Sequence, residues 1–398
     1  MKNVAWNKVK VGSLCTRVTS GGTPKSTNAE YYDNGKIPWL NSKEVNFSHI
    51  YSTEKFITEK GLAESSAKWI EKNSVIVAMY GATAGQVAIA KIPLTTNQAC
   101  CNLTIDDKLA DYRYVYYYLW NQYQVLSGLA NGGAQQNLNA QIIKEFEIQL
   151  PELSVQKSIS EILFSLDEQI RINNTINHNL EEQIRVLFED FFINSQHCAN
   201  WKQGTIADLG NVVGGSTPSK AKPEYYTSNG IAWITPKDLS GNKSKFISKG
   251  ESDITPAGLR NSSAVIMPRG TVLFSSRAPI GYIAIAKNEI TTNQGFKSVV
   301  PHLHIGTAFV YCFLKHNLPK IESMASGSTF KEVSGSVMKA IPAVIPAKEA
   351  LMNFSTITQP LFDQQELLES ENQRLTRLRD ALLPKLMSGE IDVSEVEI

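Results

Sequence analysis

Two stretches of this chain repeat apolar residues at alternating intervals of four and three. In the first, from about Val155 to Phe192, the apolar positions are Ile159, Leu163, Leu166, Ile170, Leu180, Ile184, Leu187 and Phe191. Two polar residues continue the same series, Asn173 and Asn177. In the second stretch, which Gln364 and Glu371 interrupt, the positions are Phe354, Ile357, Leu361, Leu368, Leu375, Leu378 and Leu382. This is the heptad spacing of coiled coils, so it predicts two long helices packed on each other, the first roughly 50 Å long.

The rest of the chain has short β-branched apolar runs separated by turn residues. Four runs read as strands: Ser74–Tyr80, Gln86–Ala90, Thr271–Ser275 and Tyr282–Ala286. Helices are expected over Tyr112–Leu126 and Thr307–Lys320. The predicted organisation is an α+β protein with two mixed lobes, residues 1–150 (lobe 1) and 196–345 (lobe 2), each with a curved, mostly antiparallel sheet. The helices would occupy residues 151–195 and 346–398.

The two lobes repeat one sequence with an offset of 194 to 197 residues. Gly-Gly-Thr-Pro at 21–24 returns as Gly-Ser-Thr-Pro at 215–218, and Thr-Thr-Asn-Gln at 95–98 returns unchanged at 291–294. Trp39 matches Trp233, and both are expected in the core. The offset continues into the two helices, so the chain is a tandem duplication of a lobe followed by a helix. A period this long predicts a molecule with two-fold pseudo-symmetry rather than a solenoid.

The net charge of +1 conceals a separation of charge along the chain. Lysines and arginines against acids number 15 and 12 in residues 1–150 and 16 and 8 in residues 196–345, which gives +3 and +8. The counts are 3 and 8 in residues 151–195 and 5 and 10 in residues 346–398, which gives −5 for each helix. Basic lobes can approach a phosphate backbone and acidic helices would be repelled by it, although charged residues also simply solvate surfaces.

Several classes of chemistry have no motif here. The sequence has no Asn-Pro-Pro-aromatic element for methyl transfer to an amino group, no glycine fingerprint for a nucleotide or S-adenosylmethionine, no P-loop and no nucleophile motif. His302 and His304 lack further ligands at metal spacing, so no metal site is expected. The five cysteines form no CxxC pair, and no apolar run could span a membrane, which fits a reducing cytoplasm. The chain is expected to catalyse nothing alone.

Taken together, these motifs resemble the specificity (S) subunits of type I restriction-modification systems. The resemblance covers essentially the whole chain and rests on the two Thr-Pro turns, both Thr-Thr-Asn-Gln runs, Ser-Arg-Ala-Pro-Ile-Gly at 276–281, Gly-Ala-Gln-Gln-Asn-Leu at 133–138 and the segment Leu-Leu-Pro-Lys-Leu-Met-Ser-Gly-Glu-Ile at 382–391. It implies that each lobe is a target-recognition domain reading one half of a split, asymmetric site in double-stranded DNA. The helices would pack antiparallel as a spacer, through Ile159, Leu166, Ile170, Asn173, Asn177, Leu180, Ile184, Leu187, Leu361, Leu368, Leu375 and Leu382.

The resemblance also implies partners and cofactors outside this chain. Two DNA-methylation (M) subunits would bring S-adenosylmethionine, and restriction (R) subunits would bring ATP and Mg²⁺. No cofactor, metal or membrane is expected for the chain itself. Two other classes remain open: a self-contained enzyme, against which the missing methyl-transfer motifs argue, and a two-lobed scaffold or carbohydrate-binding protein without DNA.

Candidate DNA-contacting residues follow from position in the repeat. They are Lys25, Lys43, Tyr80, Thr83, Gln98, Gln135, Gln136, Lys220, Lys237, Ser276, Arg277, Gln294 and Lys297. The four lysines outside Lys297 would contact phosphates, or remain solvated. Arg277 would offer a bidentate fork to guanine or pin its own loop. Gln98 and Gln294 are identical in lobes that should read different sequences, so they favour a role in loop structure, whereas Lys297 against Cys101 is a better base-reading position.

Overall fold

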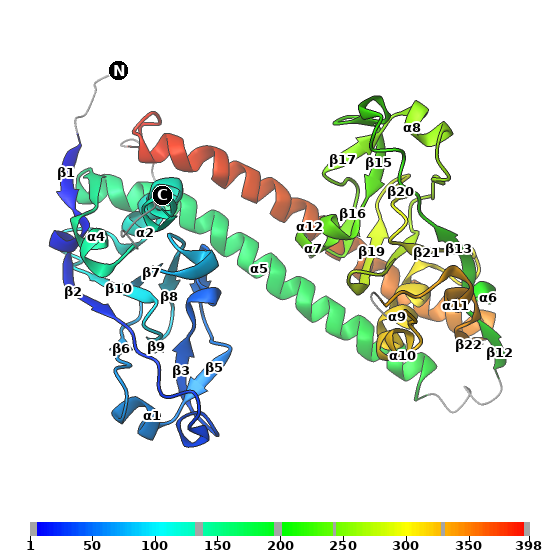
Figure 1. Ribbon diagram of the computed structural model, residues 1–398, viewed down its shortest axis with the longest axis horizontal. Coiled ribbons are helices and arrows are strands. Elements are labelled where there is room, and N and C mark those ends of the chain that lie inside the picture. The colour runs from blue at the N-terminus through cyan, green and yellow to red at the C-terminus, as the bar shows by residue number, and fades with distance from the viewer. Residues whose placement is uncertain (1–5, 132–137, 195–200, 242–243, 328–330, 394–398) are drawn as a thin grey trace. The chain divides into compact units, whose positions relative to one another are not determined.

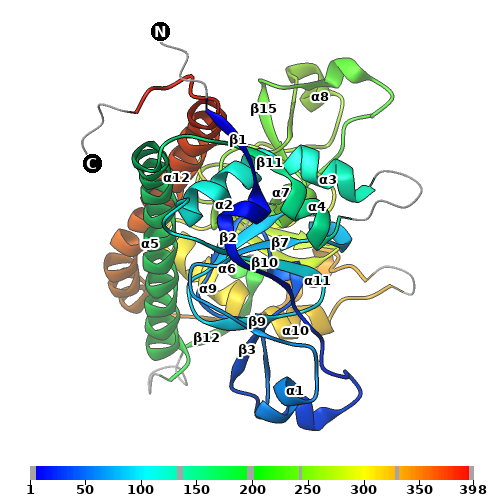
Figure 2. The ribbon, with the colours of Figure 1, turned by 90° about the vertical axis from the view of Figure 1, so that its left-hand side faces the viewer.

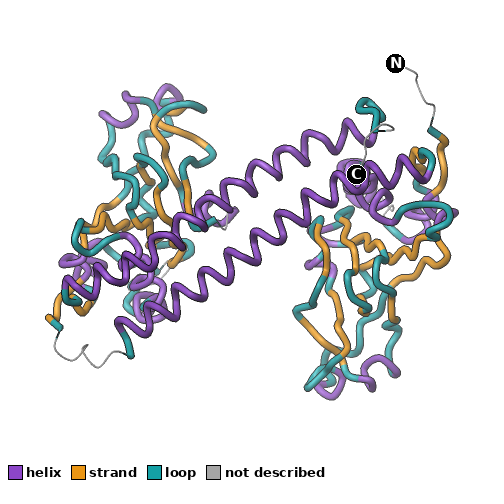
Figure 3. Tube along the Cα trace, turned by 180° about the vertical axis from the view of Figure 1, so that it is seen from behind, coloured by secondary structure: helices purple, strands orange, loops and turns teal. Residues whose placement is uncertain are grey.

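The computed structural model describes residues 6–131, 138–194, 201–241, 244–327 and 331–393. The chain folds as two compact units, unit 1 of residues 1–170 and 374–398 and unit 2 of residues 171–373. Figure 1 follows the chain through its elements, and Figure 3 separates helix from strand. Each unit contains one lobe and parts of the two longest helices, α5 (Leu153–Phe192) and α12 (Lys348–Met387).

Lobe 1 consists of short strands and four short α-helices. The strands are β1 (Asn7–Lys10), β2 (Cys15–Ser20), β3 (Ile37–Leu40), β4 (Ser48–Ile50), β5 (Lys55–Ile57), β6 (Trp69–Ile70), β7 (Val75–Ala78), β8 (Val87–Ala90), β9 (Leu94–Thr96), β10 (Cys100–Ile105) and β11 (Glu147–Leu150). The helices are α1 (Glu59–Ala63), α2 (Tyr112–Asn121), α3 (Tyr123–Asn131) and α4 (Ala140–Glu145). The strands form a five-stranded sheet of order β2-β10-β7-β8-β4, a four-stranded sheet of order β5-β3-β9-β6 and the pair β1-β11.

Lobe 2 repeats this plan. Its strands are β12 (Lys202–Thr205), β13 (Gly210–Gly214), β14 (Tyr226–Thr227), β15 (Ile231–Ile234), β16 (Phe246–Ile247), β17 (Ser252–Ile254), β18 (Val272–Ser276), β19 (Ile280–Ala286), β20 (Thr291–Thr292), β21 (Lys297–Pro301) and β22 (Pro342–Ile345). Its helices are α6 (Ile206–Leu209), α7 (Pro236–Gly241), α8 (Pro256–Arg260), α9 (Thr307–His316), α10 (Leu318–Ser323) and α11 (Gly335–Ala340). The sheets have the orders β13-β21-β18-β19-β16, β14-β17-β15-β20 and β12-β22.

The strand pairing is mostly antiparallel, as expected, but among the described residues each lobe divides its strands over three sheets where a single curved sheet was expected. Only β4 with β8 and β3 with β9 run parallel in lobe 1, and β16 with β19 and β15 with β20 in lobe 2, among the pairs of the described residues. Val75 lies opposite Leu103 in lobe 1, and Val272 lies opposite Val299 in lobe 2. This shared register places Tyr80 of lobe 1 and Arg277 of lobe 2 at equivalent positions. It does the same for Cys101 and Lys297.

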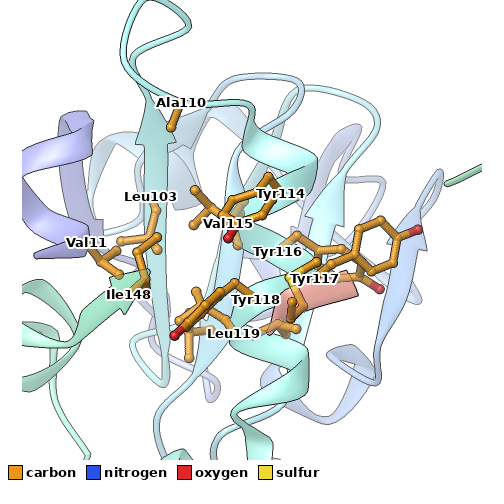
Figure 4. Packing of buried hydrophobic residues seen from close by; sticks show 14 of the residues in the cluster. Val11, Leu103, Ala110, Tyr114, Val115, Tyr116, Tyr117, Tyr118, Leu119 and Ile148 are labelled. Atoms are coloured by element: carbon orange, nitrogen blue, oxygen red, sulfur yellow. The ribbon is translucent and has the colours of Figure 1, made fainter. Parts of the chain in front are cut away.

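The core of unit 1 lies between the five-stranded sheet and α5, with α2 between them. Residues Tyr114 to Leu119 of α2 are all buried, and Figure 4 shows how they pack with Val11, Leu103 and Ile148. A helix with apolar residues all round its surface must be covered by other elements on more than one side. The second element that covers α2 is α5 (Figure 2). The Tyr117 hydroxyl of α2 donates to Asp167 Oδ2 of α5 at 2.6 Å.

The two long helices are confirmed, and within each unit they pack antiparallel. In unit 2, Asn173 donates to Asn372 Oδ1 at 2.9 Å and Gln365 donates to the Asn177 carbonyl at 3.1 Å. In unit 1, Arg379 Nη1 lies 2.7 Å from Asp167 Oδ1. As the residue number increases along α5, the residue number of the contacting partner in α12 decreases, which is the mark of antiparallel packing.

Most positions of the predicted seam are covered. Ile159, Asn173, Ile184, Leu368 and Leu375 are buried, and a second group is half-buried: Leu166, Ile170, Asn177, Leu180, Leu187, Leu361 and Leu382.

Two seam positions are wrong, since Ile357 and Leu378 of α12 remain 45% and 46% exposed. The buried neighbours of Ile357 are instead Thr358 and Phe362. An α-helix turns every 3.6 residues rather than every 3.5, so a straight helix moves away from a strict heptad stripe.

Each helix expected inside a lobe is in fact two. Tyr112–Leu126 divides into α2 and α3 around Gln122, and Thr307–Lys320 divides into α9 and α10 around Asn317. Lobe 2 has Pro319 near the start of α10, where a residue without an N–H is tolerated, but lobe 1 divides at the equivalent place without a proline.

Candidate nucleic-acid interface

The residues that the two lobes share build the same loop twice. In lobe 1, the Trp39 indole donates to the Gly22 carbonyl at 2.9 Å, the Tyr32 hydroxyl donates to the Pro24 carbonyl at 2.6 Å, and the Thr23 hydroxyl donates to Gln98 Oε1. We call residues 21–24 with 95–98, and their counterparts 215–218 with 291–294, the repeated loop.

Lobe 2 reproduces each of these bonds. Trp233 donates to the Ser216 carbonyl at 3.0 Å, Tyr226 donates to the Pro218 carbonyl at 2.6 Å, and Thr217 donates to Gln294 Oε1. The backbone agrees, since Gly22 N and Ser216 N each donate at 2.9 Å to the second threonine of the Thr-Thr-Asn-Gln run. Gln98 and Gln294 are therefore parts of a scaffold, which supports the interpretation that they shape a loop.

The repeated loop requires glycine at its first position. A Cβ on Gly21 would lie 2.2 Å from the Thr96 carbonyl oxygen, and one on Gly215 would lie 2.0 Å from that of Asn293. Real Cβ atoms essentially never approach backbone this closely. The sequence repeats this glycine because the two backbone segments of the loop touch there.

The predicted phosphate-contacting lysines lie on the surface. Lys25 and Lys220 are exposed. Lys43 and Lys237 are exposed as well, and each forms an ion pair within its own lobe, with Glu54 at 2.5 Å and with Glu251 at 2.6 Å. Since exposed pairs of this kind are weak, a phosphate can replace the glutamate as partner.

Part of the positive charge of lobe 2 is directed at the long helices and not at solvent. Lys245 and Lys315 both pair with Glu181 of α5, at 2.9 and 2.6 Å. Arg269 pairs with Glu366 of α12 at 2.7 Å, and Lys287 lies 3.8 Å from the same carboxylate. Part of the positive charge of lobe 2 therefore forms ion pairs that hold the lobe on the long helices. Only the basic residues of lobe 2 outside these pairs are candidates for contacting DNA.

The centre of this attachment is a buried lysine. Lys245 Nζ donates to Glu181 and, at 2.8 Å, to Gln365 Oε1, and it lies 3.5 Å from the centroid of the Phe362 ring. Burial alone would raise the pKa of Glu181, but the attraction of Lys245 and Lys315 lowers it to about 2. Burial lowers the pKa of Lys245 despite its partner. Neither Glu181 nor Lys245 was among the residues predicted from the sequence, although the apolar pair Phe246-Ile247 directly after Lys245 was a usable signal of burial.

The lobe-specific candidates differ in accessibility. Tyr80 is 42% exposed and precedes a short 3₁₀ turn (η4, Gly81–Thr83), in which Thr83 donates to the Ser42 carbonyl at 2.8 Å. The expectation that Ser276 contacts DNA does not fit the structure. Its side chain is fully buried and donates to the Gly295 carbonyl at 3.1 Å. Gln135 and Gln136 lie outside the described residues.

Arg277 and Lys297 lie close together at the end of β18, on either side of Glu332, which was not predicted from the sequence to contact DNA. Arg277 Nη1 lies 3.7 Å from one carboxylate oxygen of Glu332, and Lys297 Nζ lies 3.4 Å from the other. The arginine side chain remains 37% exposed. A signal for Glu332 was present, because Phe-Lys-Glu at 330–332 stands where lobe 1 has Gln-Gln-Asn at 135–137.

Two further features bear on the function classes. Within the segments that the structure describes, no group of three or more histidine, cysteine or acidic side chains could hold a metal ion. In the same segments, no helix has the length and apolarity that crossing a bilayer requires.

Comparison with known proteins gives a consistent result. Residues 3–182 and 199–377 match the profile of the type I restriction modification DNA specificity domain. The MjaIX specificity subunit of Methanocaldococcus jannaschii is 38% identical over 181 residues, 45% of this chain and 42% of that protein. The HindI specificity subunit of Haemophilus influenzae is 29% identical over 194 residues, 48% of this chain and 42% of that protein. These alignments span less than half of either relative.

A solved structure has the same fold. The S subunit of a type I restriction-modification system from M. genitalium superposes with a TM-score of 0.62 at 20% identity, and the superposition covers 97% of both chains.

Proposed function

The chain belongs to the type I restriction-modification DNA specificity family, and from this premise we propose that it is the DNA-recognition subunit of such a system. Each lobe reads one half of a split, asymmetric site in double-stranded DNA. The observation that carries this proposal is the repeated loop, a scaffold that is the same in both lobes and holds different side chains at equivalent positions. Tyr80 and Cys101 in lobe 1 correspond to Arg277 and Lys297 in lobe 2.

This arrangement fits the recognition of two different half-sites. Both lobes need the same contacts to the DNA backbone, but each needs its own contacts to the bases. Contacts to phosphate fix a protein on the duplex and carry no sequence information, whereas contacts to base edges supply it. The exposed lysines near each repeated loop fit the first task, and the exposed divergent residues Tyr80 and Arg277 fit the second. A carbohydrate-binding or scaffolding protein would give no reason for an exposed lysine at the same position of both lobes, as Lys43 and Lys237 are.

The chemistry of the system would belong to partner subunits. We propose that two methylation subunits supply S-adenosylmethionine-dependent transfer to adenine, and that restriction subunits supply ATP- and Mg²⁺-dependent cleavage. The chain itself would contribute recognition alone. Its helices α5 and α12 would set the separation of the two half-sites, so inserting one heptad into both helices should change the number of unspecified base pairs between them or abolish assembly.

The test is modified-base sequencing of genomic DNA from cells that carry this gene and its neighbouring methylase gene, with and without deletion of this gene. Loss of one split adenine-methylation motif on deletion, and its return on complementation, is the expected result. An unchanged set of methylated motifs, with the methylase expressed and no second specificity gene present, would overturn the proposal.

A further inference from the structure

Three charged side chains of lobe 2 meet on the part of the scaffold where the lobes diverge. Arg277 and Glu332 form an antiparallel backbone bridge, and Val333 N donates to the Ser276 carbonyl at 3.0 Å beside it. The bridge holds the guanidinium and the carboxylate next to each other. Lys297 Nζ reaches the other carboxylate oxygen from the start of β21. The arginine and glutamate side chains remain 37% and 34% exposed, so both can be reached by a ligand.

This mixture of charges is poorly suited to a phosphate. A phosphate site needs cations, and here a carboxylate lies within 3.7 Å of both available cations. A carboxylate at that distance would repel an approaching phosphate oxygen, and it is already paired with the lysine. Lys220 and Lys237 of the same lobe are better placed for the DNA backbone. The side chains of Lys237 and its partner Glu251 are 77% and 69% exposed, so a phosphate can displace that carboxylate, whereas the Lys297 side chain is only 16% exposed.

The same mixture matches the edge of one base pair. In the major groove a G·C pair presents two acceptors, guanine N7 and O6, followed by one donor, the cytosine N4 amino group. An arginine beside a glutamate presents the complementary series of two donors followed by one acceptor. An A·T pair presents an acceptor, a donor and an acceptor, so it would place its adenine amino group against the guanidinium.

The cluster is confined to lobe 2. The position of Arg277 is Tyr80 in lobe 1, and the position of Lys297 is Cys101, which is fully buried. Residues that read one half-site should differ between lobes in this way, whereas those that build the repeated loop are the same.

We infer that Arg277 and Glu332 read one G·C base pair in the half-site of lobe 2, with the guanidinium donating to guanine and the carboxylate accepting from cytosine. The inference rests on the proposed function and adds a specificity-determining residue, Glu332, and the base pair that it helps to select.

The test uses the complete methylation complex in cells that lack any other specificity subunit, with modified-base sequencing as the readout. The variants are Glu332→Gln, which keeps shape and loses charge, and Arg277→Lys, which keeps charge and loses the fork. The control is Glu30→Gln, which breaks an exposed ion pair of lobe 1 with Lys60. Wild type is expected to require G·C at one position of the half-site of lobe 2. Both variants should relax that position alone, lowering discrimination roughly 5- to 150-fold, and the control should leave the motif intact.

The possible results distinguish a failure of this inference from a failure of the proposed function. A wild-type chain that directs no split motif would overturn the proposed function itself. A wild-type motif that stays unchanged in both variants, or that relaxes at different positions in the two, would overturn the reading of one base pair by this pair. If Glu332→Gln abolished methylation altogether, Arg277→Lys would decide alone, because its relaxation at a G·C position is still required.

Discussion

Replacing Glu181 by glutamine removes the one carboxylate that holds two lysines of lobe 2 on helix α5. Glu181 accepts from Lys245, Lys315 and the Tyr311 hydroxyl, at 2.9, 2.6 and 2.9 Å. The glutamine would keep the shape of the side chain and could still accept from the tyrosine. It would leave Lys245, whose side chain is only 7% exposed, without its charged partner.

Two separate arguments give the size of the loss. Folding lowers the pKa of Glu181 from 4.5 to about 2, and at about 1.4 kcal/mol for each pKa unit this corresponds to roughly 3 kcal/mol of stability at neutral pH. Breaking a buried ion pair by removing one partner costs about 3–5 kcal/mol. We therefore expect Glu181→Gln to lower the free energy of unfolding of unit 2 by about 3 kcal/mol at pH 7.

The sign of the pH dependence follows from the lowered pKa. A carboxyl whose pKa is depressed on folding stabilises the fold above its unfolded value near 4.5, and this contribution is lost as the pH falls toward about 2. The stability difference between wild type and Glu181→Gln should therefore be full at pH 7 and shrink steadily below pH 4.5.

Urea titration with pulsed hydrogen exchange and mass spectrometry would measure the effect, because peptides report on the two units separately. The control is Glu182→Gln at the adjacent position, where the carboxylate forms only an exposed pair with Arg185 and the change should stay within about 0.5 kcal/mol. A loss below 1 kcal/mol for Glu181→Gln, or equal loss in both units, would refute the reasoning.

Three further expectations follow from the structure. Asn173→Ala should lower the unfolding free energy of unit 2 by about 1–3 kcal/mol in urea titrations, because polar groups of α12 lose a buried donor; an unchanged midpoint would contradict this. Gly21→Ala should reduce hydrogen-exchange protection in lobe 1 while lobe 2 keeps its own, since the new Cβ meets the Thr96 carbonyl. Burial raises the pKa of Cys101 and Cys312 to about 12, so iodoacetamide at pH 8 should leave both unmodified until urea unfolds the chain, as peptide mass mapping would show.

The sequence predicted the parts of this fold that depend on periodicity and repetition. Heptad spacing located α5 and α12, and the tandem repeat predicted two lobes of one topology, because both signals extend over many residues. Breaks within elements were harder to predict. No periodic pattern marks the divisions at Gln122 and Asn317, and the exposure of Ile357 and Leu378 depends on how far a straight helix departs from its heptad stripe.

The candidate interface was only partly predictable, because burial and pairing depend on contacts across the fold. Ser276 and Arg277 are neighbours in sequence, yet one side chain is fully buried and the other is 37% exposed. The net charge of lobe 2 gave no sign that Lys245 faces Glu181 and not solvent. Differences between the lobes were the most informative signal, since Glu332 stands in a segment that diverges.

The composition of unit 1 has a consequence for synthesis of the protein on the ribosome. Its core joins α2 and the first part of α5 to Leu383, Leu386 and Val393, which are translated more than 200 residues after residue 170. At about 5–20 residues per second, the nascent lobe 1 waits roughly 10–40 s for these side chains. Unit 2, residues 171–373, is one continuous segment and has no such delay. The lobe made first is thus the lobe completed last, and its unfinished apolar face is what chaperones would meet during translation.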